Sequence, residues 1–402
     1  MTSWIVCQLG AREHYAIPRA LHHSGQLHCL VTAAWVPPQS WLNRVPGLRS
    51  LCDRNHPDLT NASIRSFTPG LLQFEETHRL KKTGSWECMI ARNHWFQKRA
   101  ISYLQSIKQP NNSSTKLFSY SYAALELLRY AKQRGWYTVL GQIDPGIYEE
   151  KIVAAEQVKY PDLAPDWQPV PHDYWQRWQQ ECELADQIIV NSSWSRHLLE
   201  QAGVNSNKVK IITLVYTPPQ AVQAFQRRYP DTFSQKRPLR VLFLGLVTLR
   251  KGIATLLEAI QQLEGEPVEF WIVGPQNIKI PHHLLQHPQI KWVGPIPRSQ
   301  VQTYYQQADI FLFPTLSDGF GLTQLEAQAW KLPIITSQNC GEVVRHDVNG
   351  LLLPEVSSMA ISAALRDCYQ QPQKLLAYAQ KSNFLPEFTP DTLNQSLVSI
   401  KM

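Results

Sequence analysis

The sequence lacks the cysteine spacing of a metal site or of a disulfide framework. Its seven cysteines are scattered over 402 residues, and no two of them form a Cys-x-x-Cys pair. An odd number of isolated cysteines indicates reduced thiols and argues against a zinc site. We therefore expect a cytoplasmic protein with no bound metal and no cofactor.

Long hydrophobic segments are also absent. No apolar run approaches the ~18 residues of a membrane span, and the first residues lack the basic and apolar regions of a signal peptide. The chain has no G-x-G-x-x-G fingerprint for dinucleotides and no Asp-x-Asp motif in a position suited to a metal ion. No nucleic-acid-binding module is present either, so we expect no nucleic-acid partner.

The composition is that of a globular protein with two cores. Hydrophobic residues make up 44% of the chain, and its 402 residues suit two domains of roughly 150–200 residues each. The pattern of strands and helices predicts a first domain at 1–216 and a second domain at 240–383. A proline-containing linker at 217–239 separates them, and a tail follows at 384–402.

The net charge of +7 is unevenly distributed. Seven basic residues and one acidic residue lie between Arg79 and Lys108, with Trp86, Trp95 and Phe96 among them. One interpretation is a surface that docks on an anionic membrane or holds an acidic acceptor. The other is a solvated basic face with buried aromatic residues.

The clearest pattern in the chain is a strand, a turn and a helix in its second half. A short apolar run at 310–313 without helical period indicates a buried parallel strand. A polar, glycine-containing turn follows at Ser317–Gly321, and a helical pattern begins at Leu322. The order of these elements is that of a doubly wound sheet.

The turn and the helix start suit a nucleotide sugar. Gly319 and Gly321 let the backbone approach a ligand closely, and the first turn of the helix offers N–H groups and the positive end of its dipole to an anion. Glu326 lies about one turn into the helix, and its side chain tilts back toward that site. Asp318 precedes the turn, where a carboxylate suits sugar hydroxyls better than phosphates.

The spacing Asp318-Gly-Phe-Gly-Leu-x-x-Leu-Glu326 resembles the signature of the group 1 (family four) retaining glycosyltransferases. The usual first residue is Glu, so the side chain of Asp318 is one methylene shorter and reaches less far toward the sugar. The alternative is a Rossmann-like turn with incidental acids. The resemblance implies donor contacts from six residues of the turn and helix start: Asp318, Gly319, Phe320, Gly321, Leu322 and Glu326.

The resemblance also implies a fold. The expected architecture is α/β of the GT-B type, in which two doubly wound Rossmann-like domains face each other across a cleft. The last helix of the family returns to the first domain, and we expect the tail at 384–402 to do so.

A second match lies between Gly245 and Gly252, where a strand leads into the helix 253–263. Arg250 and Lys251 can face a diphosphate there and stabilise it as it leaves. Cations at a helix start oppose its dipole, so their position indicates an anion between them. The family usually has an arginine directly after the first glycine, where this chain has Leu246. Lys251 matches the family's lysine, Arg250 is a candidate replacement for the missing arginine, and exposed cations without a ligand remain the alternative.

Two further loops carry weaker signals. The resemblance places the nucleotide base near the loop after strand 290–293, which makes Ile296 the candidate neighbour of the base. In the first half, the loop after the first strand lies at the edge of the sheet that faces the cleft. The resemblance places this loop near the donor phosphate or the acceptor, which makes Gly10, His14 and Tyr15 candidates for the acceptor side. A plain connecting loop is the alternative for both segments.

The chain lacks the histidine that the family often carries at the end of the strand 137–143. Gln142 and Asp144 stand there instead, and each is a candidate for the polar group over the reacting sugar. Aspartate before Pro-Gly is also a favoured turn residue, so capping of the turn stays open.

The resemblance implies transfer of a hexosyl-type sugar from a nucleoside diphosphate sugar to an acceptor hydroxyl, with retention of configuration and without a metal. The acceptor is a lipid, a glycan or a small molecule, and the enzyme works at the inner face of the membrane if the basic segment docks there. The candidate catalytic residues are Asp318, Lys251, Arg250, Asp144 and Gln142. The alternatives are a nucleotide-sugar epimerase of the same fold and a non-catalytic protein that binds a sugar nucleotide or a membrane.

Overall fold

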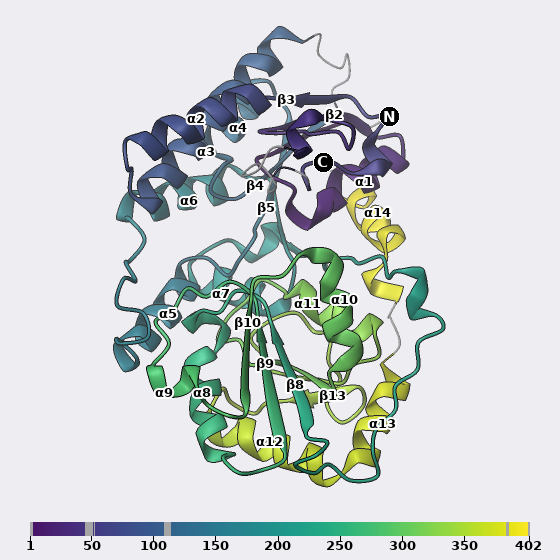
Figure 1. Cartoon of the computed structure of the whole chain (residues 1–402). Coiled ribbons are helices and arrows are strands. Elements are labelled where there is room, and N and C mark those ends of the chain that lie inside the picture. Colours follow the sequence, from purple (N-terminus) through teal and green to yellow (C-terminus); the bar gives the residue numbers. More distant parts are fainter. Residues whose placement is uncertain (1–2, 45–50, 52, 108–113, 383–385, 401–402) are drawn as a thin grey trace.

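The computed structural model describes residues 3–44, 51, 53–107, 114–382 and 386–400. These residues form two α/β domains, each built on one parallel sheet, and the domains are stacked one above the other in Figure 1. The prediction of two doubly wound Rossmann-like domains is therefore confirmed.

The first domain contains a seven-stranded sheet in the order β3-β2-β1-β4-β5-β6-β7. All neighbouring strands are parallel. Successive residues of β1 face two different cores, since Ile5 and Cys7 belong to one buried cluster and Trp4 and Val6 to the other. The strands are β1 (Ser3–Gln8), β2 (Leu27–Thr32), β3 (Ile64–Ser66), β4 (Thr115–Tyr120), β5 (Tyr137–Gly141), β6 (Gln187–Val190) and β7 (Val209–Ile211).

Helices cover both faces of this sheet (Figure 1). They are α1 (Ala16–His23), α2 (Thr68–Leu80), α3 (Ser85–Ser106), α4 (Leu125–Gln133), α6 (His172–Leu184) and α7 (Ser193–Gln201). Helix α5 (Ile147–Lys159) instead lies against α7 and against Leu249–Lys251 of the second domain. A short 3-10 turn, η1 (Arg12–Tyr15), precedes α1.

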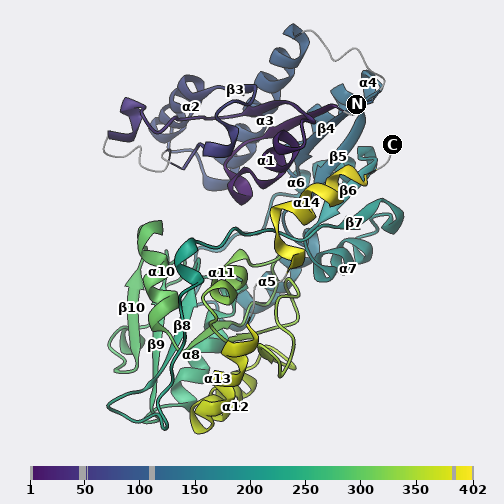
Figure 2. The same ribbon diagram turned by 90° about the vertical axis from the view of Figure 1, so that its right-hand side faces the viewer.

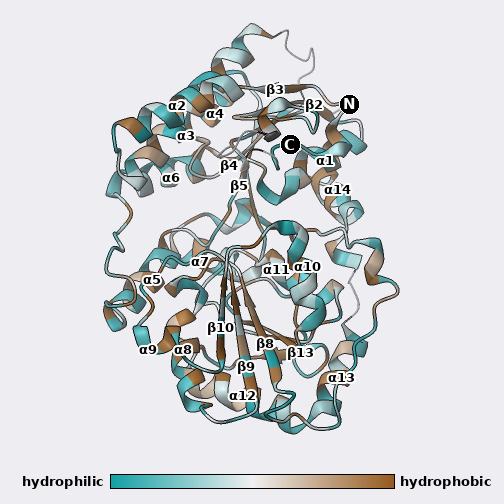
Figure 3. Cartoon of the chain, in the orientation of Figure 1, coloured by the Kyte–Doolittle hydropathy of each residue, from teal (hydrophilic) through white to brown (hydrophobic). Residues whose placement is uncertain are grey.

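The second domain contains a six-stranded parallel sheet in the order β10-β9-β8-β11-β12-β13. Its strands are hydrophobic along most of their length (Figure 3), because both faces are buried. Ile310 and Leu312 of β11 face one core, and Phe311 and Phe313 face the other. The strands are β8 (Leu239–Leu244), β9 (Val268–Val273), β10 (Ile290–Gly294), β11 (Ile310–Phe313), β12 (Ile334–Thr336) and β13 (Gly350–Leu352).

The strand order of the second sheet determines where a ligand can bind. β8 leads to β9 on one side and lies beside β11 on the other, so the loops after β8 and β11 leave the sheet in opposite directions. A crevice forms at such a switch point. The helices of this domain are α8 (Ile253–Gln262), α9 (His282–Leu285), α10 (Arg298–Gln307), α11 (Leu322–Ala329), α12 (Ser358–Gln370) and α13 (Pro372–Lys381), with a 3-10 turn η7 (Leu249–Lys251) before α8.

The structure adds elements that the sequence patterns did not reveal. Helix α5 follows the Asp-Pro-Gly turn, in a segment for which the sequence patterns gave no prediction. The residues from Trp35 to Gly84 have an irregular sequence pattern, yet strand β3 and helix α2 lie within them. Helix α3 begins at Ser85, whereas the amphipathic pattern itself begins only at Trp95. Weak amphipathic patterns explain these differences, because α2, α3 and α5 each bury few residues.

The C-terminal segment lies against the first domain. Helix α14 (Pro390–Val398) packs against α1, and Leu393, Leu397 and Ile400 belong to the same buried cluster as Trp4 of β1. Figure 2 shows this helix beside the first domain, far from α12 and α13 of the second. The linker is mostly irregular, with one 3-10 turn at η6 (Gln220–Val222). In the part of the chain described above, no helix combines the length and the hydropathy that crossing a bilayer requires.

Candidate functional site

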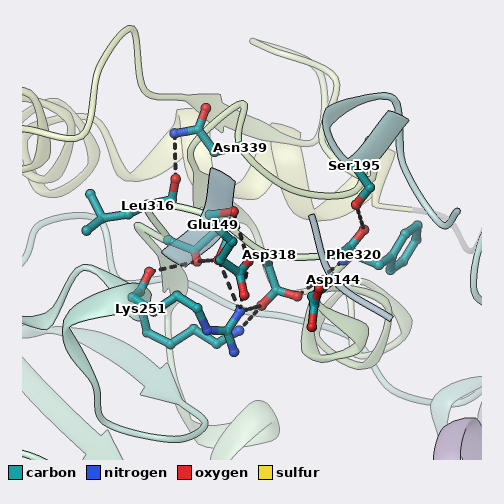
Figure 4. A network of polar contacts seen from close by, with 12 residues as sticks. Asp144, Glu149, Ser195, Lys251, Leu316, Asp318, Phe320 and Asn339 are labelled. Atoms are coloured by element: carbon teal, nitrogen blue, oxygen red, sulfur yellow. Dashed lines mark hydrogen bonds and ion pairs between the residues drawn. The ribbon is translucent and has the colours of Figure 1, made fainter. Parts of the chain in front are cut away.

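A cluster of charged side chains lies where the loops after β8 and β11 meet the first domain (Figure 4). Lys251, from η7, donates a hydrogen bond to the carboxylate of Asp318, which follows β11. Arg250 lies beside this pair, with its Nη1 atom 3.4 Å from Asp318 Oδ2. The second domain therefore brings the two predicted cations and the predicted acid into direct contact.

Helix α5 of the first domain contributes a further acid that the sequence analysis did not identify. Glu149 Oε2 lies 3.7 Å from Arg250 Nη1 and accepts a hydrogen bond of 2.9 Å from the Ser317 hydroxyl. Trp194 of α7 also donates to that hydroxyl at 3.0 Å. The predicted anion near the two cations is thus supplied by Asp318 and Glu149 of the chain itself.

Burial controls the charge of these groups. Burial raises the pKa of Glu149 to about 7, and the Asp144 carboxylate adds to this rise. The charges of Arg250 and Lys251 and the hydrogen bond from Ser317 oppose it. Burial and the Arg250 guanidinium lower the pKa of Lys251 to about 7, against the Glu149 carboxylate. Contact with the Asp318 carboxylate favours the charged lysine. The site therefore holds groups that can change charge near neutral pH.

Two glycines allow these loops to come together. Gly252 has φ +73, and a Cβ there would lie 1.9 Å from the Pro314 carbonyl oxygen, so only glycine lets the β8 loop lie against the end of β11. At Gly319 a Cβ would lie 2.6 Å from the Ile143 carbonyl oxygen of the first domain. We predicted that the absence of a side chain at Gly319 lets a ligand come close. In the structure it lets the backbone of the first domain at Ile143 come close.

The two candidates at the end of β5 have different environments. Gln142 is 2% exposed and is bonded on all sides: its Oε1 accepts from Trp178, and its Nε2 donates to Asp144 and Tyr122. Asp144 is half-buried and accepts hydrogen bonds from the Tyr122 hydroxyl at 2.5 Å and from the Gly146 N–H at 2.9 Å. Gln142 therefore orients Asp144, whereas Asp144 lines a cavity with Glu149 and Arg250.

Glu326 lies on the first turns of α11 and is half-buried. Its Oε2 accepts a hydrogen bond of 2.8 Å from Tyr305 of α10. Burial raises the pKa of Glu326, and the hydrogen bond from Tyr305 and the charge of Arg298 oppose this rise.

The remaining donor-side candidates surround this cluster. Ile296 and Leu322 are half-buried at the edge of one core of the second domain. The ring of Phe320 is buried and packs against Phe388 at 5.8 Å, so only its backbone faces the cluster, with its N–H bonded to Asp318 Oδ1 at 3.2 Å. The other two candidates belong to the same loops: Gly245 with φ +147 and Gly321 with φ +85. Leu246, which stands where the family usually has an arginine, is 39% exposed.

The acceptor-side candidates are only partly where the sequence predicted them. Gly10 lines a cavity of the first domain. His14 accepts a hydrogen bond of 2.9 Å from Arg298 of the second domain, because burial and the Arg298 charge lower the pKa of His14 to about 4 and keep it neutral. The expectation for Tyr15 was wrong: its side chain is 0% exposed and packs edge-on against Trp35 in the core.

The serines at the start of α7 cap the helix and also bridge the domains. The Ser192 hydroxyl accepts from the Ser195 N–H at 3.1 Å. The same hydroxyl donates to the Gly319 carbonyl oxygen at 2.8 Å. A capping residue of the first domain thus holds the loop that carries Asp318.

The basic segment has internal partners in the described residues. Arg79 pairs with Glu76, and Arg92 pairs with Glu75, each at 2.9 Å. Phe96 is fully buried and Trp95 packs on the first core, as the interpretation with buried aromatic residues expects. Lys108 lies outside the described residues.

A cleft runs between the domains beside the charged cluster. A cavity of about 860 Å³ is bounded by Val153 and Trp167 of the first domain and by Leu246, Arg250 and Lys279 of the second. A smaller one of about 170 Å³ contains Asp144, Glu149 and Arg250. Within the described ranges, no three His, Cys, Asp or Glu side chains are arranged to hold a metal ion, and all six described cysteines are free thiols.

Comparison with known protein families agrees with this geometry. The family model of group 1 glycosyl transferases matches residues 238–371. The chain is 28% identical over 193 residues to the amylovoran biosynthesis glycosyltransferase AmsK of Erwinia amylovora, covering 44% of this chain and 46% of that protein. It is 26% identical over 182 residues to the putative colanic acid biosynthesis glycosyltransferase WcaL of Escherichia coli, covering 40% and 45%. The matches span about half the length of these relatives or less.

Solved structures resemble the whole chain. Sucrose-phosphate synthase of Thermosynechococcus elongatus superposes with a TM-score of 0.67 at 17% identity, covering 98% of this chain and 97% of that one. HepE of Anabaena in complex with UDP superposes with a TM-score of 0.62 at 15% identity, covering 99% and 98%. The chain therefore has the GT-B fold, and its residues 238–371 match the group 1 glycosyl transferase family.

Proposed function

We propose that this chain is a glycosyltransferase that takes its sugar from a nucleoside diphosphate sugar. The observation that carries the proposal is the arrangement of Arg250, Lys251 and Asp318 at the switch point of the second sheet, opposite Asp144 and Glu149 of the first domain. Two relatives with glycosyltransferase names and the UDP bound in HepE support it.

The cations have a direct task in this reaction. A diphosphate at the start of α11 replaces the Asp318 carboxylate as partner of Lys251, and Arg250 binds it with a second positive charge. Both groups then stabilise the negative charge that grows on the leaving diphosphate. Since the protein supplies two cations at this point, we propose that transfer needs no metal ion.

The acids then hold the two sugars of the donor. Glu326, oriented by Tyr305, accepts hydrogen bonds from the ribose hydroxyls. Asp318 and Asp144 accept from the hydroxyls of the transferred hexose, Asp144 being fixed by Gln142 and Tyr122. In the transfer step the bond from the anomeric carbon to the β-phosphate oxygen breaks, and a bond to the acceptor oxygen forms on the same face. The acceptor proton passes to the leaving phosphate, so the anomeric configuration is retained.

The test is a donor screen with the full chain. UDP-, GDP- and ADP-sugars are titrated by calorimetry, and release of the free nucleotide is followed with and without a pool of saccharide and lipid acceptors. We expect one donor to bind, its nucleotide to be released faster with an acceptor, and the product to have the donor's anomeric configuration by NMR. Epimerised donor without an acceptor would indicate the epimerase, and binding without any turnover would indicate the non-catalytic protein. Loss of turnover in the presence of a chelator would contradict metal independence.

A further inference from the structure

The first domain contains a second cavity that the proposed donor does not fill. It has a volume of about 450 Å³ and lies at the carboxyl ends of β1 and β4. The loop after β1, the N-terminal half of α3 and the loop after β4 form its walls.

The lining of this cavity is positively charged. It includes three arginines, Arg12, Arg54 and Arg92, and one acidic residue, Glu13. In the described part of the chain, neither Arg12 nor Arg54 forms an ion pair. Arg12 lies over the Tyr120 ring at 5.6 Å, and its charge opposes the rise in the pKa of Glu13. Arg54 Nη1 donates to the Leu9 carbonyl oxygen at 3.4 Å. Arg92 pairs with Glu75 through Nη1, but its buried Nε has no hydrogen-bond partner among the described residues.

The arginine-lined cavity adjoins the smaller cavity of the charged cluster. Tyr122 and Tyr174 line it and also line the 170 Å³ cavity that holds Asp144, Glu149 and Arg250. A molecule in the arginine-lined cavity is therefore separated from the charged cluster by little more than these two stacked rings.

The loop that carries Arg12 has a strained backbone. Glu13, His14 and Tyr15 follow one another with φ of 52°, 51° and 60°, a region that residues other than glycine avoid. Such strain persists where surrounding contacts hold it and is concentrated at functional sites. Here Tyr15 in the core and the bond from Arg298 to His14 hold the loop and keep Arg12 at the cavity.

We propose that this cavity binds an anionic group, a carboxylate or a phosphate, on the acceptor. The planar guanidinium groups match both of these anions through paired hydrogen bonds. The inference rests on the proposed function, because only a transferase has an acceptor. It narrows that function to the transfer of sugar onto acidic saccharides or sugar phosphates.

The experiment compares three probes with the full chain in the presence of UDP: methyl glucuronide, glucose 6-phosphate and neutral methyl glucoside. Binding is followed by saturation-transfer NMR and calorimetry. Arg12→Gln and Arg54→Gln remove single guanidinium groups, and Arg79→Gln is the control, because Arg79 is exposed on α2 and outside the cavity. The side chain of Arg12 makes no hydrogen bond or ion pair among the described residues, but its charge opposes the rise in the pKa of Glu13, so the melting temperature of Arg12→Gln is measured to check that the fold is kept.

We expect at least one charged probe to bind about tenfold more tightly than the glucoside, and Arg12→Gln to remove most of that difference. The preferred charged probe distinguishes a carboxylate from a phosphate. The inference is overturned if the three probes bind alike, or if Arg12→Gln and Arg54→Gln bind the charged probes as Arg79→Gln does. The affinity for UDP is measured in the same samples. If the unaltered protein does not bind UDP, the result counts against the proposed donor and not against the anion site.

Discussion

Lys251 and Asp318 form an ion pair that joins the carboxyl ends of two neighbouring strands, β8 and β11. Each side chain is mostly buried, with 13% and 14% of its surface exposed. In the absence of a ligand each group neutralises the other. A donor diphosphate that takes over Lys251 therefore also releases the Asp318 carboxylate to the sugar.

This exchange predicts a large effect of Lys251→Ala. Transfer should fall by roughly 10²–10³-fold, the usual loss when one group that stabilises the developing negative charge is removed. The fold should persist, because Arg250 remains 3.4 Å from Asp318 and still neutralises it. Steady-state nucleotide release and thermal unfolding measure the two effects. Lys236→Ala, in the exposed linker, is the control and should change neither. Unchanged turnover in Lys251→Ala would refute the role in diphosphate binding.

Glu149 predicts a dependence of stability on pH. Because burial raises its pKa to about 7, the folded protein holds this proton more tightly than the unfolded chain does. Glu149 therefore contributes stability below its ordinary pKa of about 4.5, and that contribution is lost as pH rises to about 7. Glu149→Gln stays neutral throughout this window.

The melting temperature of Glu149→Gln relative to the unaltered protein should thus rise between pH 4.5 and pH 7, the window of this titration. Calorimetric scans of both proteins at several pH values measure this difference. A difference that stays constant, or one that falls with pH, would mean that Arg250 and not burial controls this carboxyl group.

Gly252 predicts a substitution that combines backbone strain with a steric clash. Gly252→Ala places a side chain at φ +73 and 1.9 Å from the Pro314 carbonyl oxygen, so the β8 loop must move. Gly203→Ala is the matched control, since it has φ +84 with no atom within 4 Å. The control should lose ~1–2 kcal/mol of stability, the cost of a left-handed backbone. Gly252→Ala should lose more and should also lower nucleotide affinity, as measured by denaturation and calorimetry. Equal losses in the two variants would contradict the close approach of the loops.

The contact between α14 and the first domain gives a prediction for packing. Leu397 is 0% exposed in the cluster that α14 shares with α1, so Leu397→Ala should cost about 2–5 kcal/mol of the first domain's stability. Val398 is 50% exposed on the same helix, and Val398→Ala should change stability by less than ~0.5 kcal/mol. Denaturant unfolding followed by tryptophan fluorescence compares them. Similar small losses for both would show that the helix adds little to the first domain.

The sequence predicted most reliably what depends on contiguous residues. The apolar run at 310–313 forms β11, as predicted. Asp318 after β11 lies in contact with Arg250 and Lys251 after β8, because neighbouring parallel strands end at the same edge of the sheet. Glu149 was missed because its partners are distant in the chain, and an acid in the first turn of a helix usually only complements the dipole.

Exposure was harder to predict than location. Tyr15 was expected on the acceptor side, and no local pattern reveals that three consecutive left-handed residues turn its ring into the core. The sequence offered Gln142 and Asp144 equally as the polar group over the sugar. The structure separates them, because the indole N–H of Trp178 donates to Gln142 Oε1 and encloses that side chain. Packing between segments far apart in the chain decides both cases.

The return of the C-terminal segment to the first domain has a mechanical consequence. The chain passes between the domains twice, and the two passages are joined where the Tyr216 N–H donates to the Phe388 carbonyl oxygen at 3.0 Å. We expect these two adjacent passages to act as a hinge between the domains. The separation of the domains for substrate entry would then be greatest on the side away from Tyr216 and Phe388.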